Sequence, residues 1–158
     1  MGVYSVDRLM AEARRLAAEY RRATGKTLAI SGEIAVSDAI TLLDLVPAED
    51  GAEGYDAIRR GAAGSERLQV KARMLFDDTT RRPHRLGQLK TDKPWDAVLL
   101  VLMDENYDTV EMIEASRAAI EASLAEATPN RRGTLSVARF RNIGRLVWTR
   151  EAGRVTDG

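Results

Sequence analysis

The sequence contains no cysteine among its 158 residues, and it has few prolines and aromatic residues. The missing thiols exclude disulfide bonds, thiolate zinc sites and cysteine nucleophiles, and they favour a cytoplasmic protein. The longest apolar run, residues 97 to 103, is far too short to cross a bilayer, so we expect no membrane partner. Phosphate-binding glycine loops, a Ser-His-Asp arrangement and zinc-ligand spacings are also missing, which excludes the commonest enzyme motifs.

The chain also lacks a net charge, because 24 Lys and Arg residues balance 24 Asp and Glu residues. It is therefore not a polycation made for nucleic acid. The charges are uneven along the chain, however. Residues 59 to 93 carry ten basic against four acidic side chains, residues 104 to 126 one against seven, and residues 127 to 158 seven against two. This alternation permits a basic face opposite an acidic one, although ordinary solvated surface explains the same clusters.

Apolar residues recur at helical spacing over residues 6 to 24, where Ser5 can cap the start and Gly25 can end the helix. A second helix is predicted from residue 31 to 45, before a stretch rich in turn formers. A short strand at residues 55 to 58 then leads through a glycine-rich link into further elements. A strand is predicted at residues 66 to 76 and a loop at residues 77 to 95. Two more strands follow at residues 97 to 103 and 107 to 114, and then a helix at residues 116 to 127.

Residues 135 to 148 fit either a short helix or a strand. With no internal repeat and no domain boundary, the order of elements predicts a one-domain α/β or α+β layout.

The most informative residues are Glu33, Asp56, Gln69 and Lys71. Metal-assisted phosphodiester hydrolysis needs a few oxygen ligands on rigid elements and a cation or base near the attacking water. Alternation along a strand puts Gln69 and Lys71 on one face. A hairpin of suitable register would set Asp56 beside them, with the carbonyl of Val70 as a further oxygen ligand.

In this pattern the chain resembles the PD-(D/E)XK nuclease superfamily over residues 30 to 75. The family has a helix with a glutamate, a strand with an aspartate, and a hairpin strand ending in E-x-K or Q-x-K. The resemblance implies one restriction-endonuclease-like α/β domain over residues 1 to 158, with a mixed central sheet flanked by helices, an N-terminal helix and a core at about 30 to 150. Two residues depart from the pattern: Tyr55 replaces the usual proline, and Gln69 replaces the usual acid.

The resemblance also implies roles for single residues. Asp56 would bind Mg²⁺ or Mn²⁺, Gln69 would bind it through its amide oxygen, and Glu33 would bind it directly or through water. Lys71 would orient or activate water and stabilise the developing charge. The ordinary explanations are a turn-capping aspartate, a solvated strand lysine and a glutamate favoured by the start of a helix.

Other basic residues suit phosphate contacts. Arg73 shares the strand face of Gln69 and Lys71, so we expect it to contact a phosphate backbone. The loop that follows carries further cations for nucleic acid, although a solvated loop explains them equally well: Arg81, Arg82, Arg85 and Lys90.

We therefore expect a metal-dependent nuclease that hydrolyses DNA, with defence or repair as its setting. The alternative is a catalytically weak or inactive nuclease-fold module that serves binding or interaction. Such a small chain has little room for its own target-recognition domain, so a homodimer or a partner protein is expected. A purely structural α/β domain in which the motif is a coincidence is the third hypothesis.

Overall fold

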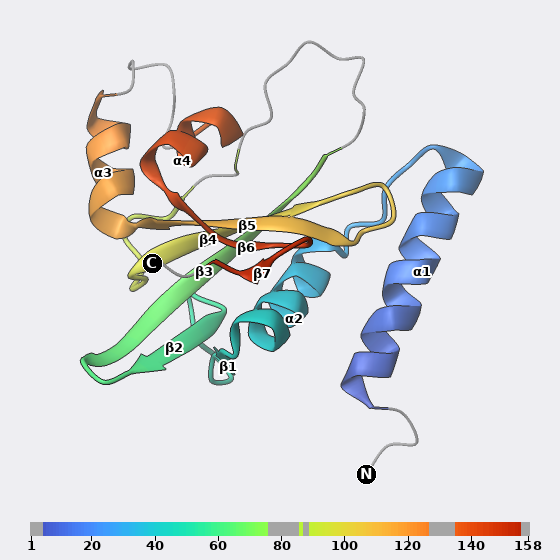
Figure 1. The fold of residues 1–158 in the computed structure, drawn as a ribbon, viewed down its shortest axis with the longest axis horizontal. Helices are drawn as coiled ribbons and strands as arrows, with labels where there is room; N and C mark the ends of the chain where they lie inside the picture. The colour runs from blue at the N-terminus through green and yellow to red at the C-terminus, as the bar shows by residue number, and fades with distance from the viewer. Residues whose placement is uncertain (1–4, 76–85, 87–88, 127–134, 156–158) are drawn as a thin grey trace.

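A computed structural model describes residues 5–75, 86, 89–126 and 135–155 of the chain. This part contains a mixed seven-stranded sheet with helices on both of its faces (Figure 1). The helices are α1 (Val6–Thr24), α2 (Ser31–Leu43), α3 (Arg117–Glu126) and α4 (Val137–Ile143). The strands are β1 (Val46–Pro47), β2 (Ala57–Gly61), β3 (Gly64–Met74), β4 (Ala97–Met103), β5 (Thr109–Ser116), β6 (Arg145–Thr149) and β7 (Gly153–Arg154).

The order of the strands in the sheet is the same as their order in the chain. Neighbouring strands are antiparallel except for β3 and β4, which are parallel. The hairpin of β2 and β3 pairs Ala57 with Leu68 at its open end and Gly61 with Gly64 at its turn. The open end of this hairpin therefore lies where the predicted aspartate enters the sheet.

Two apolar clusters lie on opposite faces of the sheet. On one face, Leu68 and Val70 of β3 pack with Ile34 and Ala39 of α2. On the other face, Leu100 of β4 packs with residues of α3 and α4. Every residue of β4 is buried, as expected for a strand covered on both faces. Figure 1 shows α2 beneath the sheet and α3 and α4 above it.

The sheet curls around α2, so strands that are not neighbours come within reach of each other. Arg59 on β2 donates to both carboxylate oxygens of Glu114 on β5, with Nη1 3.0 Å from Oε2. The carboxylate of Glu114 also lies 4.0 Å from the guanidinium of Arg145 on β6. Since Glu114 is only 8 % exposed, this ion-pair network joins distant strands inside the curl.

Several sequence predictions are confirmed. The structure has a helix over Val6–Thr24 and a strand over Ala97–Met103. The second helix is also present, but it ends at Leu43 and not at residue 45, since Asp44 takes a left-handed backbone conformation (φ 54°). The ambiguous segment contains both options in succession, helix α4 and then strand β6. Of the loop predicted at residues 77 to 95, residue 86 and residues 89 to 95 are described, and none of these lies in a helix or strand. No helix among the described residues is long and apolar enough to span a bilayer.

Candidate functional site

Asp56 lies where the chain enters β2 and is held by the backbone of both neighbouring strands. Its Oδ2 accepts a hydrogen bond from the backbone N–H of Val70 (2.8 Å). Its own N–H donates to the carbonyl of Leu68 (2.8 Å), and its carbonyl accepts from Ala48 (3.1 Å). The backbone N–H of Val70, which lies between Gln69 and Lys71 in the chain, therefore donates to the Asp56 carboxylate in place of a backbone carbonyl of a neighbouring strand.

Gly54 makes the turn that delivers Asp56 to this position. Its φ of +89° lies in the region that favours glycine, and a Cβ there would overlap the side chain of Lys93. Its carbonyl accepts a hydrogen bond from Nε2 of Gln69 (3.2 Å). The turn is thus fixed both by a backbone conformation and by a side chain of the candidate site.

Glu33 and Asp56 line the same pocket, which has a volume of about 620 Å³. Glu33 is exposed in the first turn of α2, and Asp56 is half-buried at the sheet. The first turns of α1 form another wall, through Val6 and Met10. Two carboxylates from a helix and a strand end therefore share one opening to solvent.

Gln69 is buried, with 8 % of its surface exposed, on the face of β3 opposite Val70. Its amide nitrogen is bonded to Gly54, while its Oε1 has no hydrogen-bond partner among the residues that the structure describes. A buried amide oxygen without a partner costs free energy, and such an atom calls for an explanation.

Lys71 is half-buried on the same strand. Burial lowers the pKa of its ammonium group, and the nearby charge of Arg73 lowers it further. Asp56 acts in the opposite direction and Lys90 in the same one. The cation at this position is therefore partly stripped of water and within electrostatic range of the Asp56 carboxylate.

The structure thus brings some predicted residues together and leaves others apart. Asp56 shares a pocket with Glu33 and a hydrogen bond with the Gln69–Lys71 segment. Within the described residues, no hydrogen bond or ion pair joins Asp56 to Lys71, and no three His, Cys, Asp or Glu side chains gather as a metal site.

Two of the predicted nucleic-acid contacts lie in the described part of the chain. Arg73 is half-buried, burial lowers its pKa, and its guanidinium bonds the carbonyl of Ala72. Lys90 has an exposed side chain, and its carbonyl accepts from the indole of Trp95 (2.7 Å). The other three, Arg81, Arg82 and Arg85, lie outside the described residues.

The sequence did not predict a basic pocket on the inner side of the curl, with a volume of about 340 Å³. Four arginines line it, from strands at opposite ends of the sheet: Arg59, Arg60, Arg145 and Arg154. Asp44 at the end of α2 also lines it, and Arg154 donates to the carbonyl of Leu42 (3.1 Å). The excess of arginine in residues 127 to 158 was the one sequence feature that pointed to this pocket. It could not predict that Arg59 and Arg60 of β2 lie there as well.

A comparison with known proteins gives no match to a family model and no match to a curated protein sequence.

Proposed function

We propose that this chain is a metal-dependent nuclease that hydrolyses DNA phosphodiester bonds, with a site of the PD-(D/E)XK type. One observation carries the proposal. The Asp56 carboxylate shares a pocket with Glu33 while it binds the backbone amide between Gln69 and Lys71. The pocket thus connects Asp56 to Glu33, and the hydrogen bond connects Asp56 to the Q-x-K segment.

The donor atoms at this site suit Mg²⁺ or Mn²⁺. Both ions prefer hard oxygen ligands, and the carboxylates of Glu33 and Asp56 supply these with negative charge. The Oε1 of Gln69 has no hydrogen-bond partner among the described residues, but Gln69 lies on the face of β3 opposite Val70 and does not line the pocket of Glu33 and Asp56. It would serve as a third oxygen donor only after its side chain turned toward that pocket. The two carboxylates that share the pocket fit the ion, which when bound would polarise the phosphoryl oxygen and acidify a bound water.

Lys71 supplies the positive charge that phosphoryl transfer needs. Its partly buried ammonium group is worth more to a developing negative charge than the same group in water would be. Arg73 and Lys90 lie close enough to shift its pKa, so this strand end presents several cations to a phosphate backbone. Arg81, Arg82 and Arg85 complete the proposed DNA contacts.

The proposal is tested by incubating purified protein with plasmid and single-stranded DNA in Mg²⁺ or Mn²⁺. We expect cleavage that Asp56→Asn and Lys71→Met each abolish. Matched substitutions at exposed positions, Asp50→Asn and Lys26→Met, should leave cleavage unchanged. Cleavage that survives both site substitutions, or no cleavage with either metal, would contradict the proposal.

A second candidate function is a binding or interaction module that keeps this fold without catalysis. The burial of Gln69 and its bond to Gly54 favour this option, because a neutral amide is a poorer ligand than a carboxylate. Calorimetry with Mn²⁺ separates the two functions. Metal binding that Asp56→Asn removes, in a protein that cuts no DNA, would identify the module.

A further inference from the structure

The surface of α1 carries a stripe of exposed apolar side chains. Among the described residues, the large exposed hydrophobic side chains are Val6 (65 %), Leu9 (50 %), Leu16 (54 %), Tyr20 (39 %) and, on β6, Leu146 (38 %). All but one of them therefore lie on a single helix. Gathering of this kind marks a contact surface, whereas single exposed apolar residues are ordinary.

The spacing of this stripe is that of a helix–helix seam. Its members, with two alanines between and after the large residues, recur at alternating steps of three and four: Val6, Leu9, Ala13, Leu16, Tyr20 and Ala23. Such spacing keeps one narrow stripe facing a partner helix over the whole length of α1.

A different face of α1 holds the helix to its own chain. Ala17 and Ala18 are buried there, and Arg14 donates to Asp38 on α2 (2.6 Å) and to the carbonyl of Tyr107 (3.0 Å). The stripe therefore lies beside the attached face, and its large side chains remain exposed to solvent in the part of the chain that the structure describes. Figure 1 shows α1 at the outer side of the molecule, next to α2.

We infer that α1 pairs antiparallel with α1 of a second copy of this chain, along this stripe. An antiparallel register centred between Arg14 and Arg15 brings all six stripe residues into layers. The layers are Val6 with Ala23, Leu9 with Tyr20, and Ala13 with Leu16, each formed twice. Two of the three layers set a larger side chain against alanine, which lets the helices approach closely.

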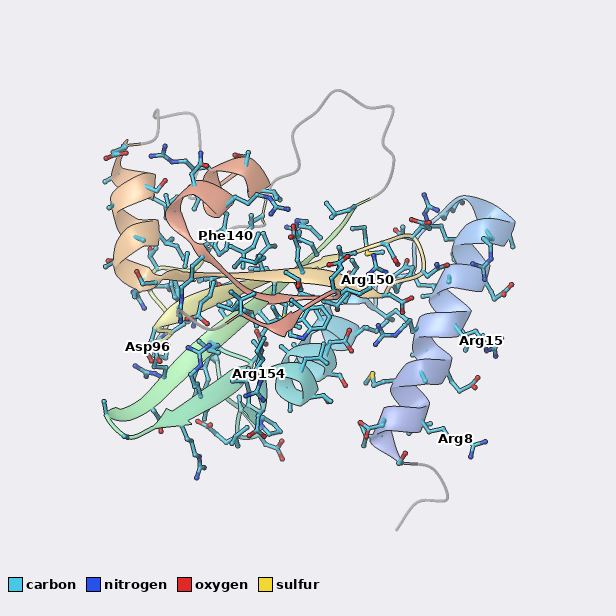
Figure 2. The ribbon with its side chains drawn as sticks, viewed as in Figure 1. Arg8, Arg15, Asp96, Phe140, Arg150 and Arg154 are labelled. Carbon is cyan, nitrogen blue, oxygen red and sulfur yellow. The ribbon has the colours of Figure 1, made fainter. Side chains whose placement is uncertain are left out.

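The charged edge of the stripe favours a second copy over an unrelated partner. Arg8, Glu12, Arg15 and Glu19 follow one another along the side of α1 that faces away from the sheet, and Figure 2 shows Arg8 and Arg15 there. In the antiparallel register, Arg8 lies opposite Glu19 of the second copy and Glu12 opposite Arg15. Each pair is offset by only about 3 Å along the helix axis. The register that pairs the apolar residues of the stripe therefore also places opposite charges across from each other.

The pairing would also bring the second copy to the candidate site. Val6, at one end of the stripe, lines the pocket of Glu33 and Asp56. Its layer partner is Ala23, so the far end of the second α1 would lie at the rim of that pocket. The dimer itself depends only on α1 and stands whether or not the site cuts DNA.

Sedimentation equilibrium over a range of protein concentrations tests the pairing. We expect a dimer for the unchanged chain and a monomer for Leu9→Gln/Leu16→Gln. The matched control Leu146→Gln, which changes an exposed leucine outside the stripe, should remain dimeric, and circular dichroism should show all three chains folded. A wild-type chain that stays monomeric at every concentration would overturn the inference, as would a dimer that the double substitution leaves intact.

A charge exchange tests whether the partner is a second copy in this register. Arg8→Glu and Glu19→Arg should each raise the dimer dissociation constant by roughly 2- to 30-fold, since each disturbs two exposed ion pairs. The double variant Arg8→Glu/Glu19→Arg should return it toward the wild-type value. The two residues lie roughly 16 Å apart along one helix, so only contact between copies explains such rescue. Additive weakening in the double variant would overturn the proposed register.

Discussion

The side chain of Asp56 illustrates how one residue serves structure and the candidate chemistry together. One carboxylate oxygen is taken by the amide of Val70, which is itself buried. The same group faces the pocket that it shares with Glu33. Substitutions that separate the hydrogen bond from the charge therefore separate the two roles.

We predict that Asp56→Ala and Asp56→Asn differ in stability although both lose metal binding. Alanine leaves the Val70 amide without an acceptor, which should lower the free energy of unfolding by about 1–3 kcal/mol. Asparagine keeps an acceptor oxygen of the same shape and should cost less. Urea unfolding of the two variants measures this difference, and equal stabilities would contradict the structural role.

We predict that Lys71 lowers the free energy of unfolding although it is needed for the proposed cleavage. Because burial lowers its pKa, the folded state disfavours the ammonium form. Lys71→Met should therefore raise the free energy of unfolding by up to about 1 kcal/mol while it removes cleavage. Thermal unfolding of the wild type and of Lys71→Met at neutral pH measures the change in stability, and the DNA assay measures the loss of cleavage.

The pH dependence of this gain has a definite sign. Between the lowered pKa and the ordinary value of 10.5, the unfolded chain binds more protons than the folded chain, so the wild type gains stability as pH rises. The advantage of Lys71→Met should be largest at neutral pH and should shrink as pH approaches 10.5. An advantage that grows with pH would contradict the burial of the charge.

At the level of elements, Arg14 attaches α1 to the rest of the molecule. Its guanidinium bonds both oxygens of Asp38 (3.1 and 2.6 Å) and the carbonyl of Tyr107. The last turn of the helix is held by Arg22, which donates to Asn106 (3.2 Å). Such an element should open without unfolding the sheet.

We predict that Arg14→Met loosens α1 alone. Hydrogen bonds to charged groups are worth about 1.5–3 kcal/mol, so amide exchange over Val6–Thr24 should quicken while exchange over Ala97–Met103 stays unchanged. The control is Lys26→Met, which removes an exposed cation just beyond the end of α1. Equal exchange in the two variants, measured by mass spectrometry, would show that Arg14 is no anchor.

For the whole molecule, Asp96 connects three elements at one corner. Its carboxylate accepts from the backbone of Arg67 on β3 (2.7 Å), and its carbonyl accepts from Arg117 on α3 (2.9 Å). The backbone hydrogen bond from Arg67 lowers the pKa of this carboxyl, and the guanidinium of the same residue adds to the effect. Figure 2 shows Asp96 at the edge of the sheet, beyond the start of β4.

This corner gives a prediction for acid unfolding. A lowered folded-state pKa stabilises the protein above the ordinary value of 3.8, and the gain is lost as pH falls through the lowered value. Asp96→Asn should therefore be less stable than wild type at neutral pH by at most about 1 kcal/mol, since the group is partly exposed. The difference should begin to shrink as pH falls to 3.8 and should vanish below the lowered folded-state pKa, and Asp92→Asn serves as the exposed control.

The sequence predicted those elements whose signal is local. Helix α1 combines a regular apolar period with Ser5 as cap and Gly25 as stop, and β4 is an apolar run too short for a buried helix. The two-residue strands β1 and β7 were not predicted, because they exist only through pairing with distant partners. The curl that joins Arg59 to Glu114 is equally non-local.

The same limit applies to the candidate site. The hairpin pattern predicted a position for Asp56 beside the Gln69–Lys71 segment, and in the structure Asp56 accepts a hydrogen bond from the backbone N–H of Val70. The pairing of the two strands follows from the short glycine-rich link between them. Alternation along β3 predicted that Gln69 and Val70 face opposite sides, but it cannot say what covers either side. The burial of Gln69 and its bond to Gly54 therefore appear only in three dimensions.

The agreement between strand order and chain order has a consequence for folding. Each strand can pair with the one made just before it, so the sheet can grow from its N-terminal edge during synthesis without waiting for distant chain. The parallel pair β3–β4 is the exception, since parallel strands need a long connection. Closing that connection should limit the rate, and substitutions at the β3–β4 interface should slow refolding more than those at β5–β6.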